Sequence, residues 1–186
     1  AGWAGSVTMG AGQFCTNPGI VVAIKGADTD AFIEAATKAL EPIGAQTMLT
    51  DGIAAAYRAG RDRVAATSGV REVVTSMCDL RTATPYLFAT TGKDWLNNHV
   101  LGEEVFGPLG LIVVVDDMDQ MRAIARSLQG QLTCTLHMDS ADTDVARSLM
   151  PILERKAGRV LANGFPTGVE VCDTMVHGGP YPASTN

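Results

Sequence analysis

Cys15 has the setting in this chain that most favours covalent chemistry. It lies in "GAGQFCTNPG" (10–19), between a glycine-rich run and a Thr-Asn-Pro-Gly sequence. Glycines permit a tight backbone and the close approach of another molecule. Pro18 and Gly19 favour a turn and stop a helix from running through the cysteine. A thiolate on such a turn could attack a carbonyl carbon, whereas a buried, inert thiol is the alternative that the local pattern leaves open.

The segment "LGEEVFGPLG" (101–110) is the second candidate, because it places two glutamates before an aromatic residue and a Gly-Pro turn. Glu104 could accept hydrogen bonds from a ribose diol, as acidic residues do in dinucleotide sites. Phe106 could lie beside a flat ring. Taken alone, these ten residues favour a solvated acidic pair in front of a core aromatic.

A long loop, 161–185, follows the last predicted strand and is rich in glycine and proline. Long ordered loops at such places often carry function. Cys172 and His177 lie in it, but their spacing matches no metal-ligand pattern, so we predict no metal site. The sequence also has no phosphate-binding glycine motif that follows a strand.

The composition is that of one globular domain and excludes several classes of partner. The chain has 186 residues, of which 46% are hydrophobic and 18% charged, and its net charge is −6. Because lysine and arginine do not cluster, we expect no nucleic-acid surface, and no basic amphipathic segment indicates a membrane. Its longest apolar run, "LGLIVVV" (109–115), is too short to span a bilayer. Four widely spaced cysteines without a C-x-x-C pair favour a reduced, cytoplasmic setting.

An α/β framework must position the candidate residues. We predict strands over 19–26, 84–90, 110–117, 131–138 and 159–164, and helices over 28–44, 50–67, 118–130 and 140–158. From residue 110 the order is strand, helix, strand, helix, strand. The fold class is therefore α/β, with a mostly parallel sheet covered by helices. In such sheets ligands meet the loops at the carboxyl ends of the strands, so we expect the site there.

Three segments together resemble the aldehyde dehydrogenase superfamily: "GQFCTNPG" (12–19), "GEEVFGPLG" (102–110) and "RVLANGFPTGVEV" (159–171). They occur in that family's order and at about its spacing, over nearly the whole chain. The wording "FCTNPG" with "CDTMVHGGPYPAST" further resembles the branch that oxidises α-ketoglutaric semialdehyde (2,5-dioxopentanoate). The resemblance implies that residues 1–186 form the catalytic domain of the aldehyde dehydrogenase fold.

The resemblance also implies roles for five residues. Cys15 corresponds to the nucleophile that forms a thiohemiacetal with a small-molecule aldehyde, and its backbone N–H would help to hold the oxyanion. Glu104 corresponds to the residue that holds the nicotinamide ribose, and Phe106 to the aromatic beside the nicotinamide. Asn163 and Phe165 fall where the family lines its aldehyde tunnel. Hydride would pass to NAD or NADP, and water would release the acid.

The resemblance implies further parts that this sequence does not contain. These are an upstream general-base glutamate, the asparagine of the oxyanion hole, the coenzyme-binding domain and the bridging arm of a homo-oligomer. The sequence starts without methionine and stops in a loop, so we expect a piece of a larger protein that is inactive alone. Two alternatives remain open, a non-catalytic interaction module of the same fold and a cysteine-dependent esterase.

Overall fold

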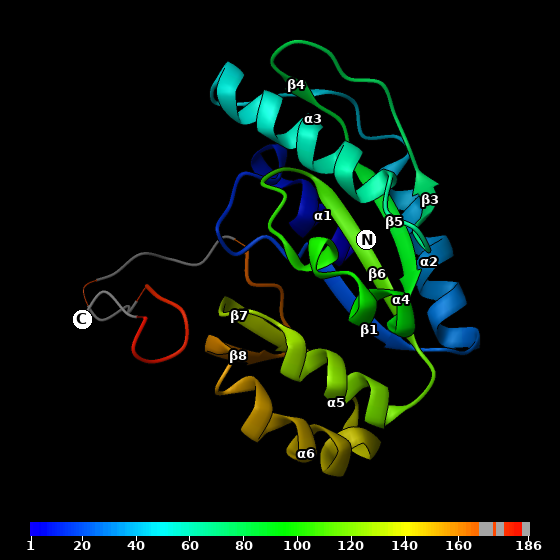
Figure 1. Ribbon diagram of the computed structural model, residues 1–186, viewed down its shortest axis with the longest axis vertical. Helices are drawn as coiled ribbons and strands as arrows, with labels where there is room; N and C mark the ends of the chain where they lie inside the picture. The colour runs from blue at the N-terminus through cyan, green and yellow to red at the C-terminus, as the bar shows by residue number, and fades with distance from the viewer. Residues whose placement is uncertain (168–172, 174–176, 184–186) are drawn as a thin grey trace.

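A four-stranded sheet in the order β1-β6-β5-β3 forms the centre of the computed structural model, which describes residues 1–167, 173 and 177–183 (Figure 1). The strands are β1 (Ile20–Ile24), β2 (Gln46–Thr47), β3 (Arg71–Val74), β4 (Thr82–Ala83), β5 (Tyr86–Thr91), β6 (Leu109–Val115), β7 (Gln131–Leu136) and β8 (Ala157–Ala162). The helices are α1 (Gly2–Thr8), α2 (Ala27–Leu40), α3 (Asp51–Ala65), α4 (Gly92–Asn97), α5 (Met118–Ser127) and α6 (Thr143–Leu153), with 3-10 turns η1 (Met9–Gly12), η2 (His99–Gly102) and η3 (Ser140–Asp142). β1 and β5 run parallel to β6, whereas β3 pairs antiparallel with β5. The α/β class with a mostly parallel sheet is confirmed.

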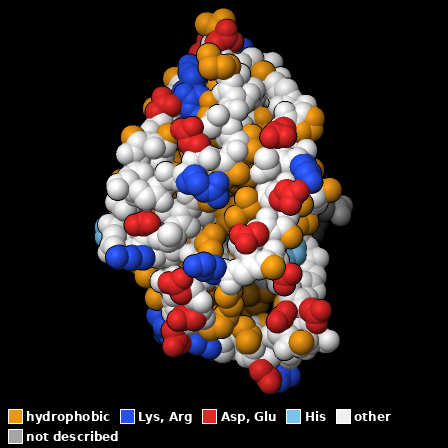
Figure 2. All heavy atoms as spheres, turned by 90° about the vertical axis from the view of Figure 1, so that its right-hand side faces the viewer, with side chains coloured by type: hydrophobic (Ala, Val, Ile, Leu, Met, Phe, Trp, Pro, Cys, Tyr) orange, Lys and Arg blue, Asp and Glu red, His pale blue; other side chains and the backbone are white. Residues whose placement is uncertain are grey.

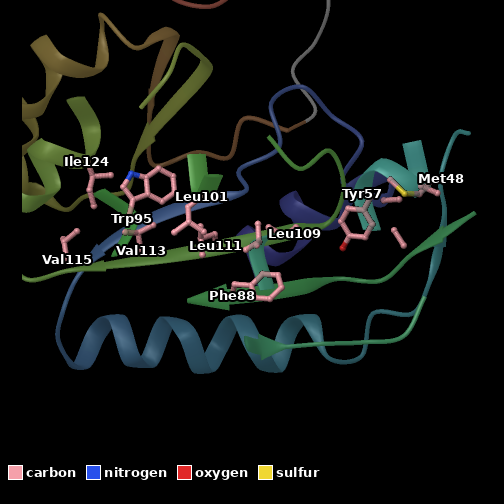
Figure 3. Close-up of a cluster of buried hydrophobic side chains, with 14 residues drawn as sticks. Met48, Tyr57, Phe88, Trp95, Leu101, Leu109, Leu111, Val113, Val115 and Ile124 are labelled. Atoms are coloured by element: carbon pink, nitrogen blue, oxygen red, sulfur yellow. The ribbon is translucent and has the colours of Figure 1, made fainter. Parts of the chain in front are cut away.

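Side chains alternate between the two faces of the central sheet, and helices cover both faces. On β6, Leu111 and Val113 pack with Tyr57 of α3 and Trp95 of α4, and Figure 3 shows this cluster. Ile112, between them, packs on the other face against residues of α1 and α2. Successive strand residues point to opposite faces, so a continuous apolar run such as "LGLIVVV" is typical of a strand buried on both sides.

The strands β7 and β8 form a separate parallel pair, covered by α5 and α6 in the lower part of Figure 1. Ala125 of α5 and Leu149 of α6 pack there with Cys134 and Val160. The expected strand-helix-strand-helix-strand order from residue 110 is present. Among the described strands, however, β7 and β8 pair only with each other, so β6 and β7 are not neighbours in one sheet.

Helix and strand limits follow local chemistry. Thr50 begins α3, because its hydroxyl oxygen accepts a hydrogen bond from the Ile53 N–H at 3.1 Å. The helix predicted over 140–158 is shorter than expected. It ends at Leu153, two residues after Pro151, and Ala157 already begins β8. The edge strand β3 lies between the helix predicted over 50–67 and the strand predicted over 84–90, where the sequence pattern assigned no element.

Charged residues of both signs are interspersed on the face that Figure 2 shows, with hydrophobic side chains visible between them. In the part of the chain that the structure describes, none of the helices has the length and apolar character needed to cross a bilayer.

Candidate active site

The first two candidate segments lie side by side because they precede neighbouring parallel strands. β1 begins at Ile20, directly after the Cys15 turn, and β6 begins at Leu109, directly after the glutamate loop. Ile20 is in register with Leu111. These two candidate segments are therefore at the amino ends of β1 and β6, whereas Asn163 and Phe165 follow the carboxyl end of β8. The expectation of carboxyl ends is therefore wrong for the Cys15 turn and the glutamate loop, since parallel pairing brings together the loops that enter two strands as well as those that leave them.

An unusual backbone leads into Cys15. Gly10, Ala11 and Gly12 have φ angles of 56°, 58° and 67°. This left-handed path is open to glycine but costs roughly 1–2 kcal/mol for a residue with a Cβ, and Ala11 is buried there. After it the chain turns so that Cys15 is exposed while the next residue, Thr16, is buried. The turn thus presents the thiol to solvent and anchors the chain on either side of it.

Backbone contact joins this turn to the glutamate loop, residues 103–107. A Cβ on Gly12 would lie 2.2 Å from the Gly107 carbonyl carbon, so no larger residue fits. The side-chain amide of Asn17 donates to the Gly107 carbonyl oxygen at 3.3 Å. Cys15 and Glu104 therefore sit on two segments that are in direct contact.

The helix α3 packs against the glutamate loop. A Cβ on Gly107 would meet the Tyr57 ring at 2.2 Å, and a Cβ on Gly60 would meet Val105 at 2.9 Å. Tyr57 is fully buried and donates to the Thr84 carbonyl oxygen at 2.8 Å. Burial raises the pKa of the Tyr57 hydroxyl, so it remains a neutral donor.

The two glutamates of the loop have different surroundings. Glu103 forms a half-exposed ion pair with Arg63, with 3.6 Å between the nitrogen and the oxygen. The Glu104 side chain is exposed and has no hydrogen bond or ion pair with another described residue. Phe106 is half-buried beside it in the sequence. Of the two carboxylates, that of Glu104 is the one without a partner among the described residues.

The segment after β8 reaches back to the Cys15 turn. The Thr16 hydroxyl donates to the Pro166 carbonyl oxygen at 3.1 Å, and the Ser6 hydroxyl donates to the Thr167 hydroxyl at 2.7 Å. Phe165 is 40% exposed. A Cβ on Gly2, in α1, would meet its ring at 2.6 Å.

Asn163 has a structural task in this segment. Its φ is 53°, and its side-chain oxygen accepts from the Met138 N–H at 2.8 Å. Phe165 packs against His137 with its ring tilted by 36° and 4.8 Å between the ring centroids. These contacts hold the loop after β8 to the end of β7. The third segment named by the sequence is thus brought to the Cys15 turn as far as Thr167, while Cys172 lies outside the described residues.

Cys78 and Cys134 have more enclosed settings than Cys15. Cys78 is half-buried, 3.6 Å from a guanidinium nitrogen of Arg61. Cys134 is half-buried in β7, and burial raises the pKa of its thiol. Within 1–167, 173 and 177–183, the structure holds no group of three or more metal-ligating side chains.

Sequence reasoning missed Asn17, Gly107 and Arg63. Asn17 and Gly107 were part of quoted turns, and Asn is a frequent turn residue, so neither stood out. The signal that could have found them is proximity to β1 and β6, since two loops that enter adjacent strands need glycine and side-chain amides where they touch. Arg63, an ordinary helix residue, carried no such signal.

Comparison with known proteins gives relatives by sequence, although no family model matches the chain. The chain is 50% identical, over its whole length, to the alpha-ketoglutaric semialdehyde dehydrogenase 2 of Azospirillum brasilense. It is 40% identical, over 97% of its length, to the alpha-ketoglutaric semialdehyde dehydrogenase of Acinetobacter baylyi. It spans 36% and 35% of those two proteins, about a third of each.

The fold also has solved counterparts. The NAD-dependent aldehyde dehydrogenase from Sinorhizobium meliloti matches 98% of this chain with a TM-score of 0.74, at 18% identity and over 37% of its own length. The chain therefore has the fold of the corresponding third of an aldehyde dehydrogenase. The resemblance drawn from the three sequence segments is confirmed.

Proposed function

We propose that this chain is the catalytic domain of an NAD(P)-dependent aldehyde dehydrogenase that converts α-ketoglutaric semialdehyde to the carboxylic acid. The observation that carries the proposal is the contact between the Cys15 turn and the glutamate loop, because it joins the segment with an exposed thiol to the segment with a carboxylate that has no described partner. The substrate follows from 50% identity to a relative of that name.

Cys15 is the nucleophile of the proposed reaction. Its thiolate adds to the aldehyde carbon and forms a thiohemiacetal on the sulfur. The Cys15 backbone N–H makes no hydrogen bond to another described residue, so it is available to the developing oxyanion. A bound nicotinamide, held beside Glu104 and Phe106, would supply the acceptor for the hydride that leaves the former aldehyde carbon. Water then attacks the resulting thioester, the C–S bond breaks, and the acid leaves as the thiolate is restored.

Glu104 and Phe106 are proposed to orient the coenzyme, NAD or NADP. The exposed Glu104 carboxylate can accept hydrogen bonds from both hydroxyls of a ribose. The Arg63 ion pair leaves Glu103 less suited to this role. Phe106, half-buried on the same loop, offers an aromatic face beside the ring.

Asn163 and Phe165 are proposed to bound the path of the aldehyde. The exposed ring of Phe165, held between Gly2 and His137, supplies an apolar wall close to the Cys15 turn. Asn163 bends the chain there, and its side-chain oxygen is engaged by Met138. We propose that Asn163 shapes this wall by fixing the path of the backbone.

The whole protein is proposed to carry the coenzyme domain and the base glutamate in its remaining two thirds and to act as a cytoplasmic homo-oligomer. The coverage of about a third of each relative supports the first point. Cys15, Cys78 and Cys134 are free thiols, which fits a reducing compartment. On this proposal the 186-residue chain alone forms no NAD(P)H from any aldehyde.

The test is NAD(P)H formation by the whole protein with α-ketoglutaric semialdehyde, compared with pentanal, which lacks the carboxylate. Cys15→Ser should lower the rate on the order of a thousandfold or more, and the control Cys78→Ser should leave it near wild type. Ester hydrolysis without any aldehyde oxidation would indicate the esterase instead. Absence of both activities would favour the non-catalytic module.

A further inference from the structure

We infer that Asn17 is a positioning residue whose side-chain amide sets the placement of Cys15 relative to Glu104. Its catalytic consequence rests on the proposed function above, whereas its structural consequence can be measured without any substrate. Nothing in the turn sequence "TNPG" by itself distinguishes this asparagine from an ordinary turn residue.

The Asn17 amide nitrogen contacts three backbone carbonyl oxygens from three segments. The distances from Nδ2 are 3.0 Å to Val7, 2.9 Å to Gly12 and 3.3 Å to Gly107. Val7 lies in the last turn of α1, where carbonyls lack helical partners. Gly12 lies in the left-handed turn before Cys15, and Gly107 closes the glutamate loop. One side chain thus ties the helix end, the turn and the loop together.

The chemistry of the site requires a donor. All three partners can only accept, so the NH₂ group of the amide must face them, with one of its two hydrogens shared. An aspartate of the same shape would point carboxylate oxygens at three carbonyls. An alanine would leave the carbonyl oxygens of Gly12 and Gly107 without this common donor.

The tie acts on the two groups of the proposed reaction. Cys15 is two residues before Asn17, and Glu104 is three residues before Gly107. A misplacement of about 1 Å in a reacting pair can cost on the order of a hundredfold in rate. Loosening the tie should therefore let the carboxylate and the thiol drift apart while each remains intact.

The first arm of the test is a double-mutant cycle in the whole protein. Glu104→Gln is made in the wild type and in Asn17→Ala, and hydride transfer is measured per active site, counted by titration of reactive Cys15. In the wild type, Glu104→Gln should slow hydride transfer by roughly tenfold or more. If Asn17 positions the loop, the same substitution made in Asn17→Ala should slow hydride transfer by less than about threefold. Asn17→Asp should behave as Asn17→Ala does.

Asn98→Ala is the matched control. Asn98 is also half-buried and donates through its side-chain amide to one carbonyl oxygen, that of Asp94 at 3.0 Å, on α4. In the Asn98→Ala background, Glu104→Gln should slow hydride transfer as much as it does in the wild type. If Glu104→Gln slows hydride transfer as much in Asn17→Ala as in the wild type, the inference is overturned. A residue that only stabilises the fold changes the number of active sites, but it does not change how much Glu104→Gln slows each one.

The second arm is amide hydrogen exchange without substrate or coenzyme. In Asn17→Ala, residues 9–19 and 103–109 should lose protection together, by roughly tenfold, and in Asn98→Ala they should not. Loss in one segment alone, or in neither, would overturn the inference. If the whole protein oxidises no aldehyde, the proposed function fails, and hydrogen exchange alone decides whether Asn17 ties the two segments.

Discussion

Gly12 and Gly107 are in backbone contact. A Cβ on Gly12 would lie 2.2 Å from the carbonyl carbon and 2.4 Å from the carbonyl oxygen of Gly107. Gly107 in turn lies against the Tyr57 ring, which a Cβ would meet at 2.2 Å. Both positions exclude every residue but glycine, and this stack of α3, glutamate loop and Cys15 turn gives the candidate site its geometry.

Gly12→Ala should therefore destabilise the protein and separate the two segments. The methyl group meets backbone atoms that cannot move aside, and φ of +67° is strained for alanine. We expect a loss of about 2–4 kcal/mol in the free energy of unfolding from overpacking and backbone strain, measured by urea denaturation. Gly5→Ala is the control, because Gly5 is exposed in α1 with nothing within 4 Å of a new Cβ. It should be neutral or stabilising by up to about 1 kcal/mol, and equal losses in the two variants would contradict the packing argument.

Cys15 should react first with limiting iodoacetamide at pH 7, before Cys78 and Cys134. Only Cys15 is exposed among these three, and burial raises the pKa of Cys134, which lowers its thiolate fraction. Labelling of Cys134 should therefore require a higher pH than labelling of an exposed thiol. Peptide mass spectrometry over pH 6–10 measures which cysteine is labelled first and how the labelling of each cysteine depends on pH. Slower labelling of Cys15 than of Cys134 at neutral pH would count against the nucleophile.

Glu104→Gln in the whole protein should slow hydride transfer by roughly ten- to a hundredfold, since it weakens a charge-assisted hydrogen bond worth about 1.5–3 kcal/mol. Cofactor-independent ester hydrolysis by Cys15 should stay near wild type. Glu103→Gln is the matched control. It removes only a half-exposed ion pair with Arg63, worth at most about 1 kcal/mol, so both activities should persist. If Glu104→Gln abolishes both activities together, or changes neither, the coenzyme role is wrong.

Asn163 should prove sensitive through its backbone as well as its side chain. Asn163→Ala loses the hydrogen bond from the Met138 N–H. It also puts alanine at a φ of 53°, a left-handed conformation that asparagine tolerates better than alanine does. We expect a loss of about 1–3 kcal/mol in unfolding free energy. Asn163→Gly loses the same bond without the strain, so its loss should be smaller. Thermal and urea unfolding measure both variants. Equal losses of stability in Asn163→Ala and Asn163→Gly would show that asparagine is not needed here for the left-handed backbone.

Local patterns predicted several elements well. The apolar runs that became β1 and β6, and the helix predicted over 50–67 that became α3, follow rules that act over a few residues, so the sequence alone indicated them. The short edge strand β3 and the early end of α6 were less clear, because an edge strand has a weak pattern and Pro151 allows a helix to continue for some residues.

The sequence by itself pointed to the candidate residues: a cysteine on a turn, a loop with two glutamates and a glycine-rich approach. Only the tertiary structure decided how they meet. It placed the Cys15 turn and the glutamate loop at the amino ends of β1 and β6, paired Glu103 rather than Glu104 with Arg63, and directed the Asn17 amide to Gly107. The reason is physical: the alternation of side chains along a strand tells which face is buried, but not which strand becomes its neighbour. That choice depends on packing between segments far apart in the chain, and it is the choice that brings the Cys15 turn into contact with the glutamate loop.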